Sequence, residues 1–317
     1  MKAVFLDYRT MGPGLDLAPL RALFPDLEIF DVTSDAQLAS RIANAEFVFT
    51  NKMRLSSELL RDTGKLRYIG LTATGTDNID LDTARKHGIA VSNIRDYCTQ
   101  SVVEHVIGSM LMLTHNLHRY NASVRAGDWQ RASEFCVLAY PVRELSGMTL
   151  GIIGFGALGK GVARIAKQLG MTVIVAARPG SASVPADRVA FDDLLVRADV
   201  ISLHCPLNEH TRGLFGSNAF ARMRPGSYLV NTARGALVDS AALVEALASG
   251  RLAGAAIDVL AKEPPVDGDA LLDYKGDNLV LSPHVAWGSN EARQNAIDEL
   301  AANAAAFLRG EQRNRVV

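Results

Sequence analysis

Short apolar runs rich in β-branched residues alternate with amphipathic segments along the whole chain of 317 residues. Five such runs predict strands in the first part of the chain, at residues 3–7, 28–31, 47–50, 68–71 and 89–91. Six longer and more apolar runs predict strands further on, at residues 149–153, 172–177, 200–205, 227–231, 255–259 and 279–281. Because strands that alternate with helices pair in parallel, the pattern predicts an α/β fold.

A segment between these two groups of strands has helical rather than strand periodicity. Its apolar residues recur at the spacing of one helix face, at Val102, Val103, Val106, Met110, Leu111 and Leu117. The pattern predicts one long helix over residues 101–117, with Ser101 and Glu104 as a capping box. This helix is expected to lead the chain into a second domain, residues 98–288. Residues 291–308 form the last helical pattern, which is expected to return to the first domain, residues 1–97 and 289–317.

The charge balance excludes several classes of partner. Lys and Arg total 33 and Asp and Glu total 34, a net charge of −1, which favours neither nucleic acid nor an anionic membrane surface. No apolar run approaches the ~20 residues that a membrane span needs, and residues 1–7 do not resemble a signal peptide. Three scattered cysteines, Cys98, Cys136 and Cys205, are not a disulfide framework, so we expect a cytoplasmic protein.

A glycine-rich turn follows the predicted strand at residues 149–153 and opens a helix. Gly154, Gly156 and Gly159 would allow a tight turn, close approach of a pyrophosphate and packing of the helix on the sheet. The amides of Ala157 and Leu158 would then face the phosphates at the positive end of the helix. A strand-to-helix turn without a ligand needs only one glycine, so dinucleotide binding is the favoured interpretation. The helix is expected to bury a stripe formed by Val162, Ile165, Ala166 and Leu169 and to end at Gly170.

These observations specify the fold class. The sequence predicts two doubly wound parallel-sheet domains, a Rossmann-type cofactor domain at residues 98–288 and a discontinuous flavodoxin-like substrate domain at residues 1–97 and 289–317. The cofactor domain is inserted into the substrate domain.

The end of the next predicted strand distinguishes between cofactors. NAD enzymes place an acidic residue there, about 20 residues past the turn, to bind the ribose 2′-hydroxyl. This chain has Ala177 followed by Arg178, and no acidic residue occurs between Lys160 and Ala186. NADP(H) is therefore favoured over NAD(H), with Ser181 and Ser183 as additional donors. The alternative is that Arg178 is a surface charge and NAD binds without its acidic partner.

Three further segments each place an ionisable residue just past a predicted strand: Arg234, Glu263 and His284. Reduction of a 2-oxo acid needs a cation that holds the carboxylate and polarises the ketone, which suits arginine. It also needs a proton donor, which suits histidine, and a carboxylate beside the histidine stabilises the protonated ring. Each residue alone could be structural, but three of them at strand ends in one domain favour a catalytic group.

The motifs resemble those of the D-isomer-specific 2-hydroxyacid dehydrogenases from end to end. The resemblance is carried by the glycine turn and by the segments at residues 73–80, 101–105, 204–207, 231–235, 263–265 and 283–284, together with Asp258. Residues 73–78, 127–130 and 284–289 are most similar to the glycerate dehydrogenase/hydroxypyruvate reductase branch. The departure is at Ala177, where many relatives have an acid.

The resemblance implies a role for each matching residue. Arg234 would bind and polarise the substrate, and His284, paired with Glu263, would be the acid/base. The substrate would also contact Asn51, Ala73, Thr74, Gly75 and Trp287. The cofactor would be lined, beyond the glycine turn and Arg178, by Val102, Cys205, Pro206, Thr211, Thr232, Ala233, Asp258 and Gly288, with Asp258 holding the carboxamide. No metal is expected, because His115 and His118 have no third ligand near them.

The implied reaction is hydride transfer between NAD(P)H and a small 2-oxo acid to give the D-2-hydroxy acid. The favoured substrates are hydroxypyruvate and glyoxylate, which would give D-glycerate and glycolate. The alternatives are a 3-phosphoglycerate or D-lactate-type dehydrogenase and a non-enzymatic dinucleotide-sensing scaffold. Lys52 and Arg54 are the cations that a phosphate group would need. The family is usually homodimeric through its cofactor domains, so the expected partners are a small 2-oxo or 2-hydroxy acid and a second copy of the chain.

Overall fold

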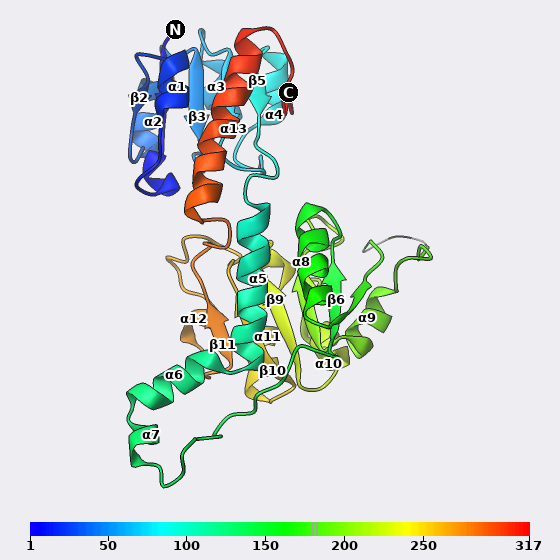
Figure 1. Cartoon of the computed structure of the whole chain (residues 1–317). Coiled ribbons are helices and arrows are strands. Elements are labelled where there is room, and N and C mark those ends of the chain that lie inside the picture. The colour runs from blue at the N-terminus through cyan, green and yellow to red at the C-terminus, as the bar shows by residue number, and fades with distance from the viewer. Residues whose placement is uncertain (179–180, 182) are drawn as a thin grey trace. The chain divides into compact units, whose positions relative to one another are not determined.

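The chain folds into two compact units, Met1–Cys98 with Gly288–Val317 and Thr99–Trp287. The structure is a computed structural model that describes residues 1–178, 181 and 183–317. Both units are α/β structures with parallel sheets, as the sequence predicts (Figure 1). The observed division places Cys98 and Gly288 with the first unit. No described helix is both long and apolar enough to cross a membrane.

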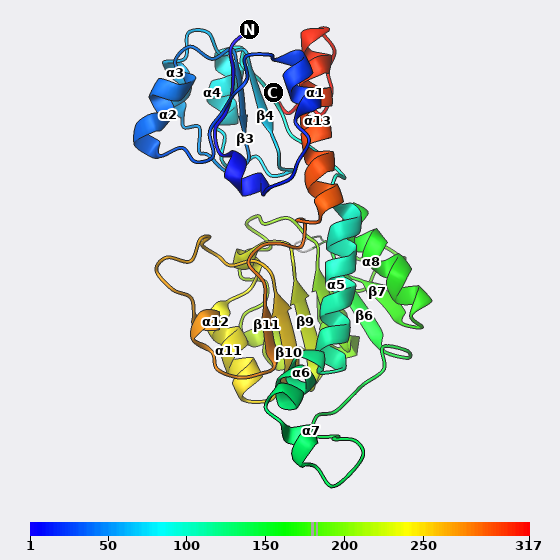
Figure 2. The ribbon, with the colours of Figure 1, turned by 60° about the vertical axis from the view of Figure 1, so that its left-hand side comes forward.

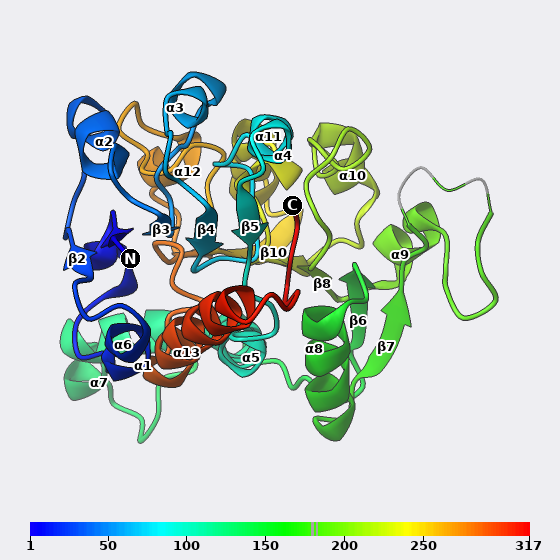
Figure 3. The same ribbon diagram turned by 90° about the horizontal axis from the view of Figure 1, so that it is seen from above.

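The first unit has a five-stranded parallel sheet in the order β2-β1-β3-β4-β5, which is the flavodoxin-like order. Its elements are β1 (Ala3–Phe5), a 3₁₀ turn (Tyr8–Met11), α1 (Ala18–Leu23), β2 (Glu28–Ile29), α2 (Asp35–Ile42), β3 (Phe47–Thr50), α3 (Ser57–Arg61), β4 (Tyr68–Leu71), α4 (Leu81–Lys86), β5 (Ala90–Ser92) and α13 (Asn290–Leu308). Figure 3 shows α2, α3 and α4 on one face of this sheet and α1 with α13 on the other.

The second unit has a six-stranded parallel sheet in the order β11-β10-β9-β8-β6-β7. Its strands are β6 (Thr149–Ile153), β7 (Thr172–Val175), β8 (Val200–Leu203), β9 (Ser227–Asn231), β10 (Leu252–Ile257) and β11 (Leu279–Leu281). Its helices are α5 (Thr99–Thr114), α6 (Leu117–Arg125), α7 (Asp128–Arg131), α8 (Ala157–Gln168), α9 (Phe191–Arg197), α10 (Ser217–Arg222), α11 (Ser240–Ala248) and α12 (Ala270–Asp273), with a 3₁₀ turn at Gly235–Leu237. The strand order reverses between β6 and β8, which is where doubly wound sheets bind ligands.

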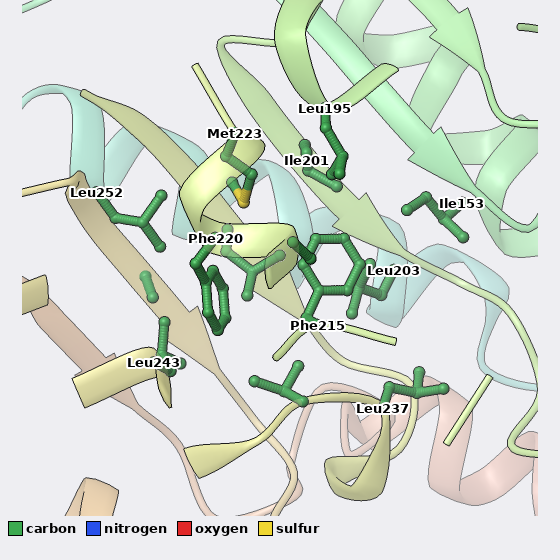
Figure 4. Packing of buried hydrophobic residues seen from close by; sticks show 14 of the residues in the cluster. Ile153, Leu195, Ile201, Leu203, Phe215, Phe220, Met223, Leu237, Leu243 and Leu252 are labelled. Atoms are coloured by element: carbon green, nitrogen blue, oxygen red, sulfur yellow. The ribbon is translucent and has the colours of Figure 1, made fainter. Parts of the chain in front are cut away.

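Helices cover both faces of this second sheet, with α5 and α8 on one face and α9, α10 and α11 on the other (Figure 3). The core on the second face surrounds Phe215 and Phe220, which pack against Ile201 and Leu203 of β8 (Figure 4). Burial on both faces explains why three of the four residues of β8, Val200, Ile201 and Leu203, are apolar.

The predicted helix over residues 101–117 is wrong at both ends. Helix α5 begins at Thr99, so Ser101 is not its cap; its hydroxyl donates instead to the carbonyl of Ala286 at 2.7 Å. At the other end α5 stops at Thr114, and Asn116 takes a left-handed conformation with a φ of 51°. Asparagine adopts this conformation at lower cost than most residues, and its side-chain amide donates to the carbonyl of Pro141. Leu117 consequently begins a new helix, α6, and is 54% exposed.

Further differences concern residues at element ends. The strands predicted at residues 3–7, 28–31, 172–177 and 200–205 end two residues earlier, and the strand predicted at residues 89–91 is Ala90–Ser92. Leu169, predicted in the buried stripe of α8, is exposed, because it caps the helix just before Gly170 turns the chain at a φ of 81°. The strand predicted at residues 255–259 is β10, which starts at Leu252 and stops at Ile257. Gly254 interrupts the apolar pattern at a register shift, and Asp258 already belongs to the following loop.

Candidate active site

The three glycines of the turn between β6 and α8 have different structural roles. Gly154 has a φ of 95°, and a Cβ atom there would lie 2.4 Å from the carbonyl carbon of His204. At Gly159 a Cβ atom would lie 2.2 Å from the carbonyl oxygen of Gly154. At Gly156 no atom of the described residues lies within 4 Å of the Cβ position. Two glycines are therefore required by the fold, and the third faces open space beside the helix N-terminus.

This geometry fits a dinucleotide phosphate. Gly156 caps α8, so the amides of Ala157 and Leu158 lie in the first turn, where helix N–H groups are available to an anion. Residues 204–206 follow β8 on the other side of the strand-order reversal, and they approach the turn at Gly154. The predicted phosphate-binding residues thus come together at the switch point of the sheet.

The loops that the resemblance places around the cofactor follow β8 and β9 at the carboxyl edge of the sheet. Cys205 is buried, and burial raises the pKa of its thiol to about 11, so the thiol stays protonated. Thr211 donates its hydroxyl to the carbonyl of Pro206 and holds that loop. The hydroxyl of Thr232 is buried and has no hydrogen-bond partner among the described residues. A ligand group that formed a hydrogen bond with this hydroxyl would remove the free-energy cost of burying it without a partner.

Two arginines lie near the end of β7. Arg178 is exposed, and the preceding amide, that of Ala177, donates to the carbonyl of Val189. This pairing brings Arg188 to the same strand end, where its guanidinium lies 4.9 Å from the ring centre of Phe155 in the glycine turn and contacts Asp187. Arg188 was not predicted from the sequence because twelve residues, 176–187, separate it from the end of β7. Within that segment, the hydroxyl of Ser181 donates to the carbonyl of Ser183.

Glu263 and His284 come together at the same edge. They follow β10 and β11, which are neighbours in the sheet, and Nδ1 of His284 lies 2.6 Å from Oε2 of Glu263. The other oxygen of Glu263 accepts from the amide of Leu260 at 2.8 Å, which fixes the carboxylate. Since Nδ1 faces the carboxylate, Nε2 is the nitrogen that remains to exchange a proton with a substrate.

Arg234 lies on the loop after β9, the next strand in the sheet. The side-chain amide of Asn231 donates to the carbonyl of Arg234 at 2.9 Å, and its oxygen accepts from the amide of Ala233 at 3.0 Å. The loop is therefore held by its own strand end, while the guanidinium is exposed and donates to the carbonyl of Ala233. Arg234, Glu263 and His284 thus follow three adjacent parallel strands.

A pocket of about 430 Å³ borders the histidine–glutamate pair. Its remaining walls are largely apolar and include Leu260, Pro264, Pro265, Leu272, Leu281 and Pro283. Trp287, half-buried, donates its indole N–H to the carbonyl of His284 at 3.0 Å. Asp258, also on the pocket wall, is buried and accepts from the amides of Val285 and Ala286. No described group of three or more His, Cys, Asp or Glu residues is arranged to hold a metal.

The predicted substrate residues of the first unit follow adjacent strands of its sheet. Asn51 follows β3, and residues 73–75 follow β4. The exposed Thr74 donates its hydroxyl to the carbonyl of Ile94 at 2.9 Å. The buried carboxylate of Asp7 accepts from the amides of Asn51 and Lys52 at 2.9 and 2.7 Å. Asp7 was not predicted, because an acidic residue after a first strand carries no signal of what its carboxylate binds.

A dinucleotide-binding turn and a histidine–glutamate pair at one edge of a parallel sheet are typical of nicotinamide-dependent dehydrogenases. The family model of the D-isomer specific 2-hydroxyacid dehydrogenase NAD binding domain matches residues 107–286. The chain belongs to this family, whose members bind a nicotinamide dinucleotide.

Full-length relatives agree with this assignment. The chain is 40% identical to a glycerate dehydrogenase of Methylorubrum extorquens over 99% of its own length and 98% of the relative's. It is 36% identical to a hydroxypyruvate reductase of Blautia hydrogenotrophica over 100% and 99% of the two chains. Among solved structures, the TT0316 protein of Thermus thermophilus superimposes with a TM-score of 0.88 at 31% identity and covers both chains completely.

The buried ring of His204 leads to a prediction about acid stability. Burial lowers its pKa from 6.5 to about 4, and Nδ1 has no partner among the described residues. The unfolded chain binds this proton near pH 6.5, whereas the folded protein binds it only near pH 4. The ring therefore contributes stability above pH 6.5 that is lost as the pH falls to 4, about 3 kcal/mol in total.

We expect His204→Gln to have a shallower loss of unfolding free energy over that pH range than the unmodified protein. Urea unfolding of the protein at several pH values gives the unfolding free energy, and its slope against pH is the quantity compared. The exposed His210 offers a control, and His210→Gln should retain the original slope. An unchanged slope in His204→Gln would contradict the assignment.

Proposed function

We propose that this protein reduces hydroxypyruvate or glyoxylate to D-glycerate or glycolate at the expense of NADPH. The observation that carries the proposal is the 2.6 Å contact between His284 and Glu263, beside the loop of Arg234 and at the sheet edge that bears the glycine turn. The names of the two full-length relatives, a glycerate dehydrogenase and a hydroxypyruvate reductase, support this choice of substrate.

The proposed mechanism divides the work among three side chains. Arg234 binds the substrate carboxylate and polarises the ketone, because its guanidinium stays charged and matches two oxygens at once. His284 gives the proton from Nε2 to the oxygen that becomes the hydroxyl. Glu263 holds the ring through Nδ1 and stabilises its protonated form. The bound cofactor supplies the hydride.

The two units have separate proposed tasks. Residues 98–288 form the cofactor-binding domain, lined by the glycine turn and the loops that contain Cys205, Thr232 and Asp258. Residues 1–97 and 289–317 form the substrate domain, in which the Thr74–Gly75 loop presents backbone amides to the carboxylate, with Asn51 nearby. The Asp7 contacts support this, because they fix the loop at Asn51 in place.

The preference for NADP(H) over NAD(H) rests on the end of β7. This strand end has no acid to bind a ribose 2′-hydroxyl, and Arg178 and Arg188 both lie there. A 2′-phosphate is the group that two guanidinium groups beside a Gly-rich turn would bind.

A homodimer formed through the cofactor domain is also proposed. Helices α6 and α7 and the loop that follows, residues 117–144, extend away from the sheet of their own unit (Figures 1 and 2). We call this segment the arm. It exposes large apolar side chains, including Phe135 at 90% and Leu138 at 82%. Apolar surface of this kind is typical of a protein interface. A second copy of the chain would cover it.

A cytoplasmic location is proposed from the three free cysteines, Cys98, Cys136 and Cys205. Recovery of the protein in a secreted or envelope fraction of the cell would contradict it.

The reaction is tested by the decrease of NADPH absorbance with hydroxypyruvate, glyoxylate, pyruvate and 3-phosphohydroxypyruvate in parallel. Hydroxypyruvate or glyoxylate should give the highest kcat/KM. His284→Asn, which tolerates the left-handed backbone at this position, should lower kcat by about 10²–10⁴-fold and leave cofactor affinity unchanged.

The other outcomes discriminate between the alternatives. A clear preference for the phosphorylated acid would favour a 3-phosphoglycerate dehydrogenase, and a preference for pyruvate a D-lactate-type enzyme. No turnover of any 2-oxo acid would favour the dinucleotide-sensing scaffold. Near-normal turnover in His284→Asn would remove the histidine from the mechanism.

The cofactor proposal predicts that the unmodified protein has a higher kcat/KM with NADPH than with NADH. Arg178→Gln and Arg188→Gln should each reduce that ratio by about 10–100-fold, the range for one charge-assisted hydrogen bond. The exposed Arg197 on α9 provides the control, and Arg197→Gln should leave the ratio unchanged. A preference of the unmodified protein for NADH would refute the assignment.

The arm proposal predicts a mass near twice 34.1 kDa by light scattering. Replacement of Phe135 and Leu138 together by Glu should give a monomer, because buried charges destabilise an apolar interface. Val196, 59% exposed on α9, gives the control, and Val196→Glu should remain dimeric. A dimer that survives the double substitution would show that the arm is not the interface.

A further inference from the structure

The backbone at His284 has a conformation that is unfavourable for this amino acid. His284 has a φ of 54°, in the left-handed region, which is unfavourable for a residue other than glycine. The second unit ends shortly afterwards, at Trp287, where the chain passes to the other unit. The position of the imidazole therefore depends on what else holds residues 282–286.

Asp258 holds this loop through both its backbone and its side chain. Its carbonyl accepts from the amide of His284 at 2.7 Å. Its carboxylate accepts from the amides of Val285 and Ala286, both at 2.9 Å. Because the carboxylate is buried, these bonds are shielded from water and are stronger than surface bonds of the same kind. Three consecutive amides thus converge on one residue.

Ser282 adds a fourth contact and extends it to another helix. Its hydroxyl donates to Oδ1 of Asp258 at 2.6 Å, and Nε2 of His105 on α5 lies 3.2 Å from the same hydroxyl oxygen. A hydroxyl has one proton, and here it goes to the carboxylate, so His105 must be the donor to Ser282. The direction of donation is therefore from His105 to Ser282 to Asp258.

Helix α5 also contacts the other end of this loop. Ser101, one turn before His105, donates its hydroxyl to the carbonyl of Ala286 at 2.7 Å. The helix therefore contacts the loop at Ser282 and at Ala286, one on each side of His284. Both contacts come from the first two turns of α5, next to the other point where the chain passes between units.

We infer that His105, Ser101 and Ser282 are positioning residues that act through Asp258 to hold the imidazole of His284 in its reactive place. This set of contacts, from Ser101 and His105 through Ser282 to Asp258, is the α5 clamp. The inference rests on the proposed role of His284 as proton donor. Ser101, His105 and Ser282 are not among the residues proposed to bind substrate or cofactor, so we expect their main effect on the placement of His284 for proton transfer.

The test is a substitution in the middle of the clamp. Ser282→Ala removes the hydroxyl, and we expect kcat for the preferred 2-oxo acid to fall about 10-fold. The KM and the dissociation constant for NADPH should change less than kcat, because Asp258, in the proposed cofactor site, keeps its bonds from Val285 and Ala286 when the Ser282 hydroxyl is lost. Ser282→Thr keeps a hydroxyl and should recover most of the activity. A residue of purely structural importance would instead lower the melting temperature without this split between kcat and KM.

The helix side of the clamp is tested separately, which also covers the case in which Ser282→Ala does not fold. His105→Leu removes the donor and should lower kcat about threefold to tenfold, while His105→Gln retains an N–H donor and should restore it. His115, just beyond the end of α5, provides the matched control, and His115→Leu should leave kcat unchanged. Unchanged kcat in both Ser282→Ala and His105→Leu would overturn the inference.

A readout that does not need turnover separates the clamp from the proposed function. In protein with isotope-labelled histidine, the ring resonance of His284 is identified by its loss in His284→Asn. Ser282→Ala should shift and broaden this resonance, because the ring is no longer held in one position. If the resonance changes but no 2-oxo acid is reduced, the clamp stands and the proposed function fails. If the acids are reduced but the resonance and kcat are unaffected, the clamp fails.

Discussion

Parallel pairing of β9, β10 and β11 is the constraint on which the candidate site depends. In a parallel sheet every strand delivers the residues that follow it to the same edge. Arg234, Glu263 and His284 are distant in sequence, yet each needs only to follow its own strand to reach that edge. Strand β6 is parallel to these strands, so the glycine turn that follows it lies at the same edge. The histidine–glutamate pair and the glycine turn are therefore consequences of one topology.

Most of the fold could be predicted from sequence because its strands are buried on both faces. Mostly apolar runs such as those of β8 and β9 predict strands correctly, although the strand predicted at residues 200–205 ends at Leu203. Two of the errors occurred where a single residue overrode a periodic pattern. Asn116 ended a helix whose apolar stripe continued to Leu117, and Gly254 masked the first half of β10. Conformational exceptions of this kind depend on contacts made elsewhere, such as the bond from Asn116 to Pro141.

The residues of the candidate site also differ in whether the sequence alone could predict them. Ionisable residues that directly follow a strand, such as His284, belong to motifs that are visible in the sequence alone. Side chains that accept hydrogen bonds from backbone amides belong to no recognisable sequence motif. For that reason Asp7 and the contacts of Asp258 were not predicted. Arg188 was missed for a different reason, since only the pairing of Val189 with residues at the end of β7 brings it to the glycine turn.

The bonds from Val285 and Ala286 to Asp258 use main-chain donors, which every amino acid except proline provides. The exposed side chain at position 285 is consequently free to vary in size and polarity without disturbing the loop, whereas Ala286 is restricted by its burial. Proline at either position would remove a donor and leave a buried carboxylate oxygen short of a partner. The same reasoning extends to Asn51 and Lys52, whose amides bind Asp7. Positions whose side chains are exposed, such as 285, can therefore vary in natural or designed variants, provided that they avoid this one amino acid.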